Sequence, residues 1–309
     1  MTSLPALLGD TRPATSTTAR PIPDVPGVTH RFVTARGARF HVAQAGSGDP
    51  VVLLHGVAQH WYAWRKVIPE LAGEYELFCI DLRGCGWSEG TRRGYGTEDQ
   101  ARDVLAVMDA LGLKRVHLVG HESGGWLGFA LCLRAPERFG GFLALNASHP
   151  WLGHARLMRT AWRFWYTAFW EYPGAGRLVL RHWPQFTRFL LRRWAGPPYR
   201  WEPADLEEFV QASRTPSSSR AIQQMLWQFV LRDIPALVLR RHRRGRLTVP
   251  TLILGGEKDP VTRPAAGRYM AAHADDLQIA LVPGWHLLAE TTPRVVAAAA
   301  REHFGERRY

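Results

Sequence analysis

The chain has 309 residues, of which 46% are hydrophobic and 21% are charged, a composition typical of a globular protein that buries one large core or two small ones. No apolar stretch is long enough to span a bilayer, so we expect no membrane span. The formal net charge of +12 comes almost entirely from arginine, a bias that GC-rich coding also produces, and we expect no nucleic-acid partner.

Residues 1–27 contain much Pro, Thr, Ala and Ser without a hydrophobic period, which predicts a flexible leader. The apolar run at residues 4–8 is short and lacks a basic lead-in, so we do not interpret it as a signal peptide. The three cysteines are odd in number and lack metal-ligand spacing, a pattern typical of a reduced compartment without disulfides. We therefore expect a cytoplasmic protein.

Residues 29–45 predict a β-hairpin that turns near Gly37, and after it short apolar runs alternate with segments of helical spacing. The runs predicted as buried strands are residues 51–54, 77–80, 116–119, 142–145, 251–254 and 277–282. The segments predicted as helices are residues 61–72, 98–111, 126–133, 264–273 and 293–304. This alternation predicts an α/β fold with a doubly wound, mostly parallel sheet, in which chemistry lies at the carboxyl ends of the strands.

Residues 149–236 break the alternation, because they have helical spacing without strand signals and hold eight of the 13 tryptophans. We expect a helical cap (a lid) inserted between the core segments 28–148 and 237–309, with a mobile loop at residues 215–219. A helical subdomain whose tryptophans only fill its own core is the alternative. An interfacial membrane helix over residues 155–170 is a further alternative that we rank lower.

A dense arginine run follows the predicted cap at residues 240–246. It precedes a predicted strand and has no interleaved aromatic residues, so we interpret it as a solvated connector. Binding of an acidic partner stays open as the alternative, and the sequence does not fix the role of this run.

The segment Gly120-His121-Glu122-Ser123-Gly124 joins a predicted strand to a predicted helix. A strand, a tight turn between glycines and a helix together predict a nucleophile elbow. The elbow needs small residues two positions before and after its central residue, because the backbone there is strained and crowded. Glu122 is therefore the central residue, where a serine would indicate an esterase and an aspartate a dehalogenase or an epoxide hydrolase.

Three predicted strand ends supply Glu122, Asp259 and His286, the chain order of nucleophile, acid and histidine in α/β-hydrolases. Alone, Asp259 would be a turn residue in a glycine-rich loop, but the joint occurrence favours a catalytic triad. His286 can take a proton from water when Asp259 holds its other ring nitrogen. The backbone N–H groups of Val57 and Ser123 would form the oxyanion hole.

Nearly all of the chain after the leader resembles α/β-hydrolase-fold proteins of the epoxide hydrolase and haloalkane dehalogenase branch, and the resemblance is weakest in the cap. The resemblance rests on three segments: His-Gly at residues 55–56, WYAWR at residues 61–65 and the loop at residues 81–88. In that family a cap tyrosine seven residues before a proline donates to the epoxide oxygen. Tyr166 and Pro173 match this spacing.

Four positions depart from the family's pattern. Glu122 stands where the family has aspartate, and Ala58 stands where it has proline. Ser123 replaces the tryptophan that binds halide in the dehalogenases, which argues against that activity. The second cap tyrosine falls at Trp227, which can donate an N–H but is a poorer acid than a phenol. The candidates for substrate binding are His55, Trp227 and Trp285.

The resemblance implies an enzyme that opens an epoxide of an apolar or aromatic small molecule, with Glu122 as nucleophile, His286 activating water and Tyr166 polarising the epoxide. Three alternatives stay open: Glu122 as a general base in a cyclase, isomerase or lyase reaction, Ser123 as the nucleophile of an esterase or lactonase, and a hydrolase fold that binds a ligand without catalysis. We expect no cofactor and no metal, and the sequence leaves a homo-oligomer open.

Overall fold

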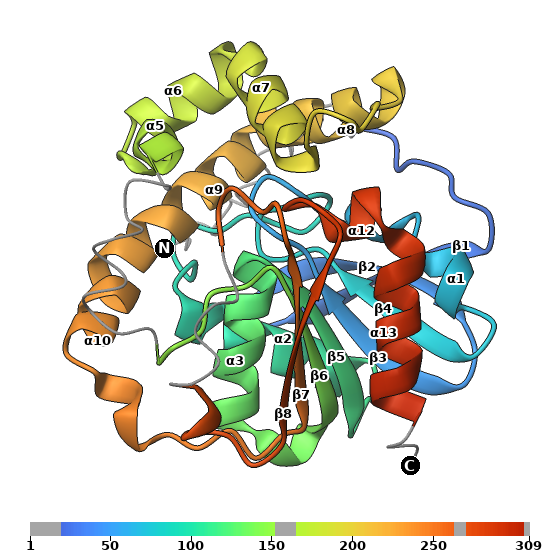
Figure 1. Cartoon of the computed structure of the whole chain (residues 1–309). Helices are drawn as coiled ribbons and strands as arrows, with labels where there is room; N and C mark the ends of the chain where they lie inside the picture. The colour runs from blue at the N-terminus through green and yellow to red at the C-terminus, as the bar shows by residue number, and fades with distance from the viewer. Residues whose placement is uncertain (1–19, 152–164, 263–269, 306–309) are drawn as a thin grey trace, which may run out of the picture.

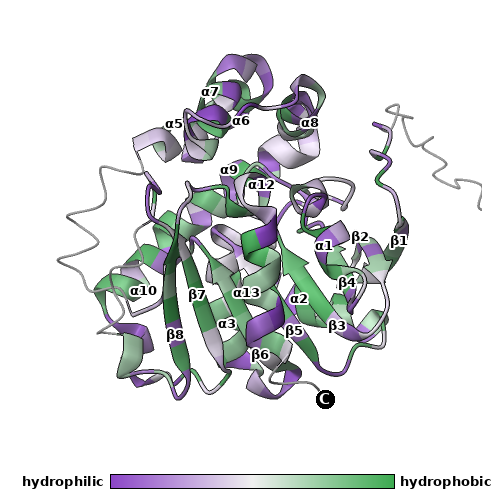
Figure 2. Ribbon diagram, turned by 45° about the vertical axis from the view of Figure 1, so that its right-hand side comes forward, coloured by the Kyte–Doolittle hydropathy of each residue, from purple (hydrophilic) through white to green (hydrophobic). Residues whose placement is uncertain are grey.

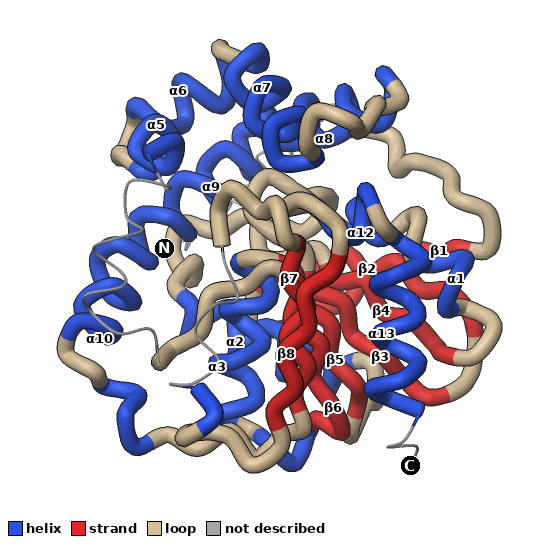
Figure 3. Tube along the Cα trace, viewed as in Figure 1, coloured by secondary structure: helices blue, strands red, loops and turns tan. Residues whose placement is uncertain are grey.

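The computed structural model describes residues 20–151, 165–262 and 270–305. Eight strands form one sheet in the order β1-β2-β4-β3-β5-β6-β7-β8, with the β1–β2 and β2–β4 pairs antiparallel and the other pairs parallel (Figure 3). The strands are β1 Val28–Ala35, β2 Ala38–Gly46, β3 Asp49–Leu54, β4 Tyr75–Ile80, β5 Val116–His121, β6 Phe139–Leu145, β7 Thr251–Gly256 and β8 Leu277–Val282. The predicted hairpin and the six predicted strands are confirmed.

Helices cover both faces of the sheet (Figure 1). The helices outside the cap are η1 Trp61–Trp64, α1 Ile68–Leu71, α2 Thr97–Ala110, α3 Ser123–Arg134, η2 Pro136–Arg138, α12 Leu288–Thr291 and α13 Pro293–Gly305. Helices α2 and α3 pack on one face and α1 and α13 on the other, which buries the central strands on both sides. Double burial explains why these strands are continuous apolar runs, as the green central strands of Figure 2 show.

The helix predicted over residues 61–72 is wrong, because this segment divides into the short helices η1 and α1. Pro69 at the start of α1 has no N–H to donate to the preceding turn. At the start of η1, the backbone N–H of Trp61 donates to the side chain of Asp81. Of the helix predicted over residues 264–273, only residues 270–273 are among those described.

A second group of helices lies over the carboxyl ends of the strands (Figure 1). They are α5 Ala168–Glu171, α6 Ala175–His182, α7 Pro184–Ala195, α8 Pro203–Arg214 and α9 Pro216–Gln228. The short helices η4 Phe229–Asp233, α10 Ile234–Val238 and η5 Arg241–Arg244 follow α9 and lead back down the side of the core to β7 (Figure 1). Within the described ranges, none of the helices has the length and apolarity needed to cross a membrane.

The loop predicted at residues 215–219 is wrong, because α9 begins there. Thr215 caps the helix by accepting the N–H of Ser218 at 3.1 Å, and Pro216 occupies the first turn. A capping threonine followed by proline is a helix start, since proline at that position loses no helical hydrogen bond.

Two sets of charged side chains join the cap to the core. Arg65 binds Glu290 at 2.7 and 2.8 Å and Asp205 of α8 at 2.5 Å. Arg20, near the end of the predicted leader, pairs with Glu208 of α8 and lies 4.0 Å above the Trp87 ring. Two carboxylates one turn apart on helix α8 thereby anchor the cap to the core.

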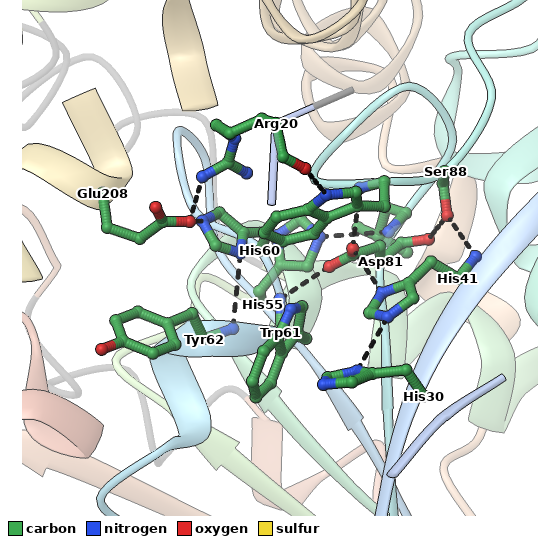
Figure 4. A network of polar contacts seen from close by, with 12 residues as sticks. Arg20, His30, His41, His55, His60, Trp61, Tyr62, Asp81, Ser88 and Glu208 are labelled. Atoms are coloured by element: carbon green, nitrogen blue, oxygen red, sulfur yellow. Dashed lines mark hydrogen bonds and ion pairs between the residues drawn. The ribbon is translucent and has the colours of Figure 1, made fainter. Parts of the chain in front are cut away.

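The carboxylate of Asp81, directly after β4, is fully buried and connects three segments (Figure 4). It accepts the N–H groups of Trp61 at 2.7 Å and Trp87 at 3.0 Å, and lies 2.8 Å from Nδ1 of His41. Burial raises the pKa of Asp81, but the bond to His41 and the charges of nearby histidines outweigh it, and the net pKa is lowered. Asp81 therefore holds the loops at this edge as a buried anion.

We expect Asp81→Ala to lower the free energy of unfolding by about 3–5 kcal/mol, because it leaves two N–H groups and an imidazole buried without their acceptor. The matched control is Asp109→Ala, whose largely exposed carboxylate pairs with Arg138 and contributes about 1 kcal/mol or less. Urea unfolding of both variants checks this prediction, and an equally small loss in both would contradict it.

Candidate active site

Glu122 lies at the turn between β5 and α3 with φ 51° and ψ −109°, a conformation that costs a non-glycine residue about 1–3 kcal/mol. A Cβ on Gly120 would lie 2.5 Å from the carbonyl oxygen of Gly124, and a Cβ on Gly124 would lie 2.2 Å from that of Leu54. Only glycine fits at these two positions. The positive φ falls on Glu122 and not on Ser123, which is the first residue of α3.

The carboxylate of Glu122 reaches back to the loop after β3. Its Oε2 accepts the backbone N–H of Val57 at 2.9 Å. Strands β3 and β5 are neighbours in the sheet, and the chain leaves β3 toward β4 on its other side. The carboxyl ends at such a switch point form the crevice where ligands bind in α/β sheets. A backbone donor thus fixes one carboxylate oxygen of Glu122 at this crevice.

Asp259 and His286 come from the loops after β7 and β8 and meet at 3.0 Å between Oδ2 and Nδ1. The hydroxyl of Thr262 and the N–H of Val261 also donate to Asp259, at 2.6 and 2.7 Å. Burial raises the pKa of Asp259, but the charge and hydrogen bond of His286 outweigh it, and the net pKa is lowered. The imidazole is therefore held by an ionised carboxylate.

Burial lowers the pKa of His286, but the charge of Asp259, its hydrogen bond and the charge of Glu122 outweigh that effect. The net pKa lies above the ordinary value of 6.5. Because Asp259 occupies Nδ1, proton exchange with a bound molecule falls to Nε2.

A small cavity between core and cap brings several of these groups together. Among the described residues it is lined by Val57, Gln59, His121, Glu122, Tyr166, Thr167, Trp170, Trp194, Leu226, His286 and Leu287. The space open to the centre of a water molecule is about 10 Å³, which holds about one water. The cap is thus closed over the carboxylate and the imidazole.

Tyr166 is the phenol of this cavity and is 7% exposed. Its ring packs edge-on against Trp194, with 5.3 Å between the ring centroids. Burial, together with the charges of Glu122 and Asp259, raises the pKa of Tyr166 well above 10. The phenol keeps its proton and can donate it.

All three predicted substrate-binding residues lie outside this lining. His55 is fully buried, with Nδ1 donating to the carbonyl of Gly56 at 2.9 Å and Nε2 accepting the N–H of Leu82 at 3.1 Å. The Trp285 ring lies against Gly196, where an added Cβ would be 2.3 Å from it. Trp227 faces Tyr172, with 6.3 Å between the ring centroids.

Two cavity residues that sequence reasoning missed are Gln59 and His121. His121 Nε2 donates to the carbonyl of His286 at 2.9 Å, and its Nδ1 lies 3.0 Å from the Gln59 amide. Burial and the charge of His286 lower the pKa of His121 to about 4, so its ring is neutral. The pair ties the elbow to the loop that carries His286. The signal available in the sequence was His121 itself, a polar residue at the end of a buried strand.

Comparison with known proteins agrees with this architecture. Residues 49–293 match the family described as alpha/beta hydrolase fold. The soluble epoxide hydrolase of Corynebacterium sp. (strain C12) is 43% identical over 102 residues, 33% of this chain and 36% of that protein. The fluoroacetate dehalogenase of Burkholderia sp. is 26% identical over 293 residues, 91% of this chain and 95% of that protein.

The structure of the epoxide hydrolase CorEH without ligand superposes with a TM-score of 0.78 at 25% identity, and covers 91% of this chain and 100% of that one. The aligned segments span only about a third of the length of the first curated relatives. The family match, in contrast, spans most of the chain. The chain belongs to the α/β-hydrolase fold family, in its epoxide hydrolase-like branch.

Proposed function

We propose that the protein hydrolyses an epoxide of a small apolar or aromatic molecule through a covalent ester on Glu122. The observation that carries this proposal is the contact between Glu122 Oε2 and the N–H of Val57, in a cavity shared with His286 and Tyr166. One carboxylate oxygen is held by a backbone donor, and the other is available for attack. An acidic donor and a base lie around the same space.

In the first step the free oxygen of Glu122 attacks an epoxide carbon and forms an ester. The carbon–oxygen bond of the ring breaks, and its electron pair stays on the oxygen, which takes the proton of Tyr166. Because the pKa of Tyr166 is raised, the phenol keeps its proton until the ring oxygen of the epoxide takes it.

In the second step His286 takes a proton from water, and the hydroxide attacks the ester carbonyl. The N–H groups of Val57 and Ser123 stabilise the oxyanion. Collapse releases the diol oxygen, which takes the proton from His286, and the proton left on Glu122 returns to Tyr166. Ester formation also removes the charge of Glu122, which lowers the pKa of His286 when a neutral base is needed.

Single-turnover reaction in ¹⁸O-labelled water tests the covalent route. We expect the label in the Glu122 carboxylate, found by peptide mass spectrometry, and a diol that carries unlabelled oxygen from the enzyme. Label in the diol alone would favour Glu122 as a general base. Ester hydrolysis lost in Ser123→Ala but kept in Glu122→Gln would indicate a serine nucleophile, which the backbone geometry disfavours.

We expect Tyr166→Phe to lower kcat for epoxide opening by about 10²-fold, because a positioned general acid contributes about that factor or more. The fold and the cavity shape are retained, since only the hydroxyl is removed. Rapid-quench measurement of ester formation checks the prediction. Tyr172→Phe, at an exposed tyrosine of the same cap, is the control and should react at the wild-type rate.

We expect Glu122→Asp to lower the rate of ester formation by about a hundredfold, although aspartate is the residue of the family's pattern. One methylene less withdraws the carboxylate by about 1 Å from Val57 and from the substrate. Glu257→Asp, at an exposed loop position, is the matched control. A faster Glu122→Asp enzyme would show that the site is not built around glutamate.

A further inference from the structure

The outer face of the cap carries four large aromatic side chains in an unusually open position. Trp165 is 44% exposed, Phe169 41%, Trp183 47% and Phe189 47%. We name this group the cap aromatic patch. Single exposed apolar residues are common on proteins, whereas contiguous groups mark sites of interaction.

Ring contacts show that the patch is continuous. The centroid of Phe169 lies 6.0 Å from that of Trp165 and 6.3 Å from that of Trp183. Beneath them the buried Phe186 lies 5.0 Å from Trp183 and 6.5 Å from Phe189. All four exposed rings thus contact the buried ring of Phe186 on α7.

Arginines border these rings. Arg192 and Arg193 follow Phe189 at the three- and four-residue spacings that place helical side chains on one face. Both are exposed, as is Arg181 in the last turn of α6. In the described part of the chain these three arginines have no ion-pair partner, whereas Arg188 pairs with Glu207.

We propose that the cap aromatic patch docks the protein onto an anionic membrane surface. Trp and Phe rings insert at the boundary between headgroups and acyl chains, and arginines bind lipid phosphates. A second copy is a poorer occupant, because a two-fold contact through this face would bring the unpaired arginines near their own copies. The net charge of +12 adds long-range attraction to the same partner.

The patch and the cavity are two sides of one structural unit. Trp165 and Phe169 face outward, whereas Tyr166 and Trp170, next to them in the chain, line the cavity. Docking would therefore act on the elements that close over Glu122. The effect of docking on the cavity rests on the proposed function, whereas the docking itself does not.

Co-sedimentation with phosphatidylcholine vesicles, with and without phosphatidylglycerol, tests the proposal. We expect binding to the anionic vesicles, weakened by added salt, and little binding to the neutral ones. The double variant R192A/R193A should bind about thirtyfold more weakly, since each arginine near the surface contributes roughly a fivefold factor. F169S/W183S should weaken binding and reduce the blue shift of tryptophan fluorescence on binding, with Trp165 as the remaining tryptophan of the patch.

The matched control is R243A/R244A, which removes the same charge from the exposed segment after α10, far from α6 and α7 in Figure 1. Equal weakening in both arginine pairs would overturn the proposal, as would binding that ignores phosphatidylglycerol. A dimer in analytical ultracentrifugation that F169S/W183S dissociates would identify a second copy as the occupant instead. Thermal midpoints within a few degrees of wild type establish that the variants are folded. Because the readout is vesicle binding, failure of the catalytic proposal would not alter it.

Discussion

Replacement of His286 by glutamine is expected to stop turnover after the first step and to trap the ester on Glu122. The alkylation step does not use His286, so the burst is retained, while steady-state turnover falls by about four orders of magnitude or more. Intact-protein mass spectrometry should show a mass increase equal to that of one epoxide. The loss of turnover is large because Asp259 occupies Nδ1 of His286 and leaves Nε2 to take the proton from water, a role that glutamine cannot fill.

The control for this experiment is the double variant E122Q/H286Q, in which an amide replaces the attacking carboxylate. It should form no adduct with the same epoxide. An adduct at another residue, or full turnover in His286→Gln, would remove the histidine from the mechanism.

Asp259→Asn is expected to lower turnover by about 10⁴-fold and to shift its pH dependence. In the free enzyme the charges of Asp259 and Glu122 hold the pKa of His286 above 6.5, and in the ester the charge of Asp259 remains. Because His286 must be neutral to accept a proton, hydrolysis of the ester should rise with pH. Without the charge of Asp259 the pKa falls, and the rise moves to lower pH at a much lower rate, since asparagine no longer stabilises the imidazolium.

The pH profile of single-turnover ester hydrolysis measures this shift. Thr262→Val separates charge from hydrogen bonding, because it removes one donor to Asp259 and leaves the carboxylate in place. If the rate of ester hydrolysis rises at the same pH in Asp259→Asn as in the wild type, another group is the base.

Much of the fold could be predicted from the chain because its signals are local. All six apolar runs are strands, and helices bury five of them, whereas β8 lies at the edge of the sheet and is partly exposed. The elbow could be located from Gly120 and Gly124, whose Cβ atoms would collide with the backbone. The start of α9 was missed although its signal, threonine before proline, was also local.

The candidate site was only partly predictable, because each side chain's partners lie far away in the sequence. His55 could be recognised as a residue at a strand end, but not as one whose ring is bound to the backbone on both sides. Gln59 and His121 meet across 62 positions, a pairing that no local pattern encodes. Trp227 and Trp285 are aromatic like Trp170 and Trp194, and only packing decides which pair faces the cavity.

By itself, the sequence determined the family, the order of the catalytic candidates along the chain and the unusual glutamate at the turn. Backbone sterics and hydrophobic burial, which carry these signals, depend on residue type and spacing. The tertiary structure decided which side chains share a cavity, how the pKa of His286 is raised and where the aromatic surface of the cap lies. These properties depend on distances between segments that are remote in the chain, and both electrostatic interaction and packing are set by those distances.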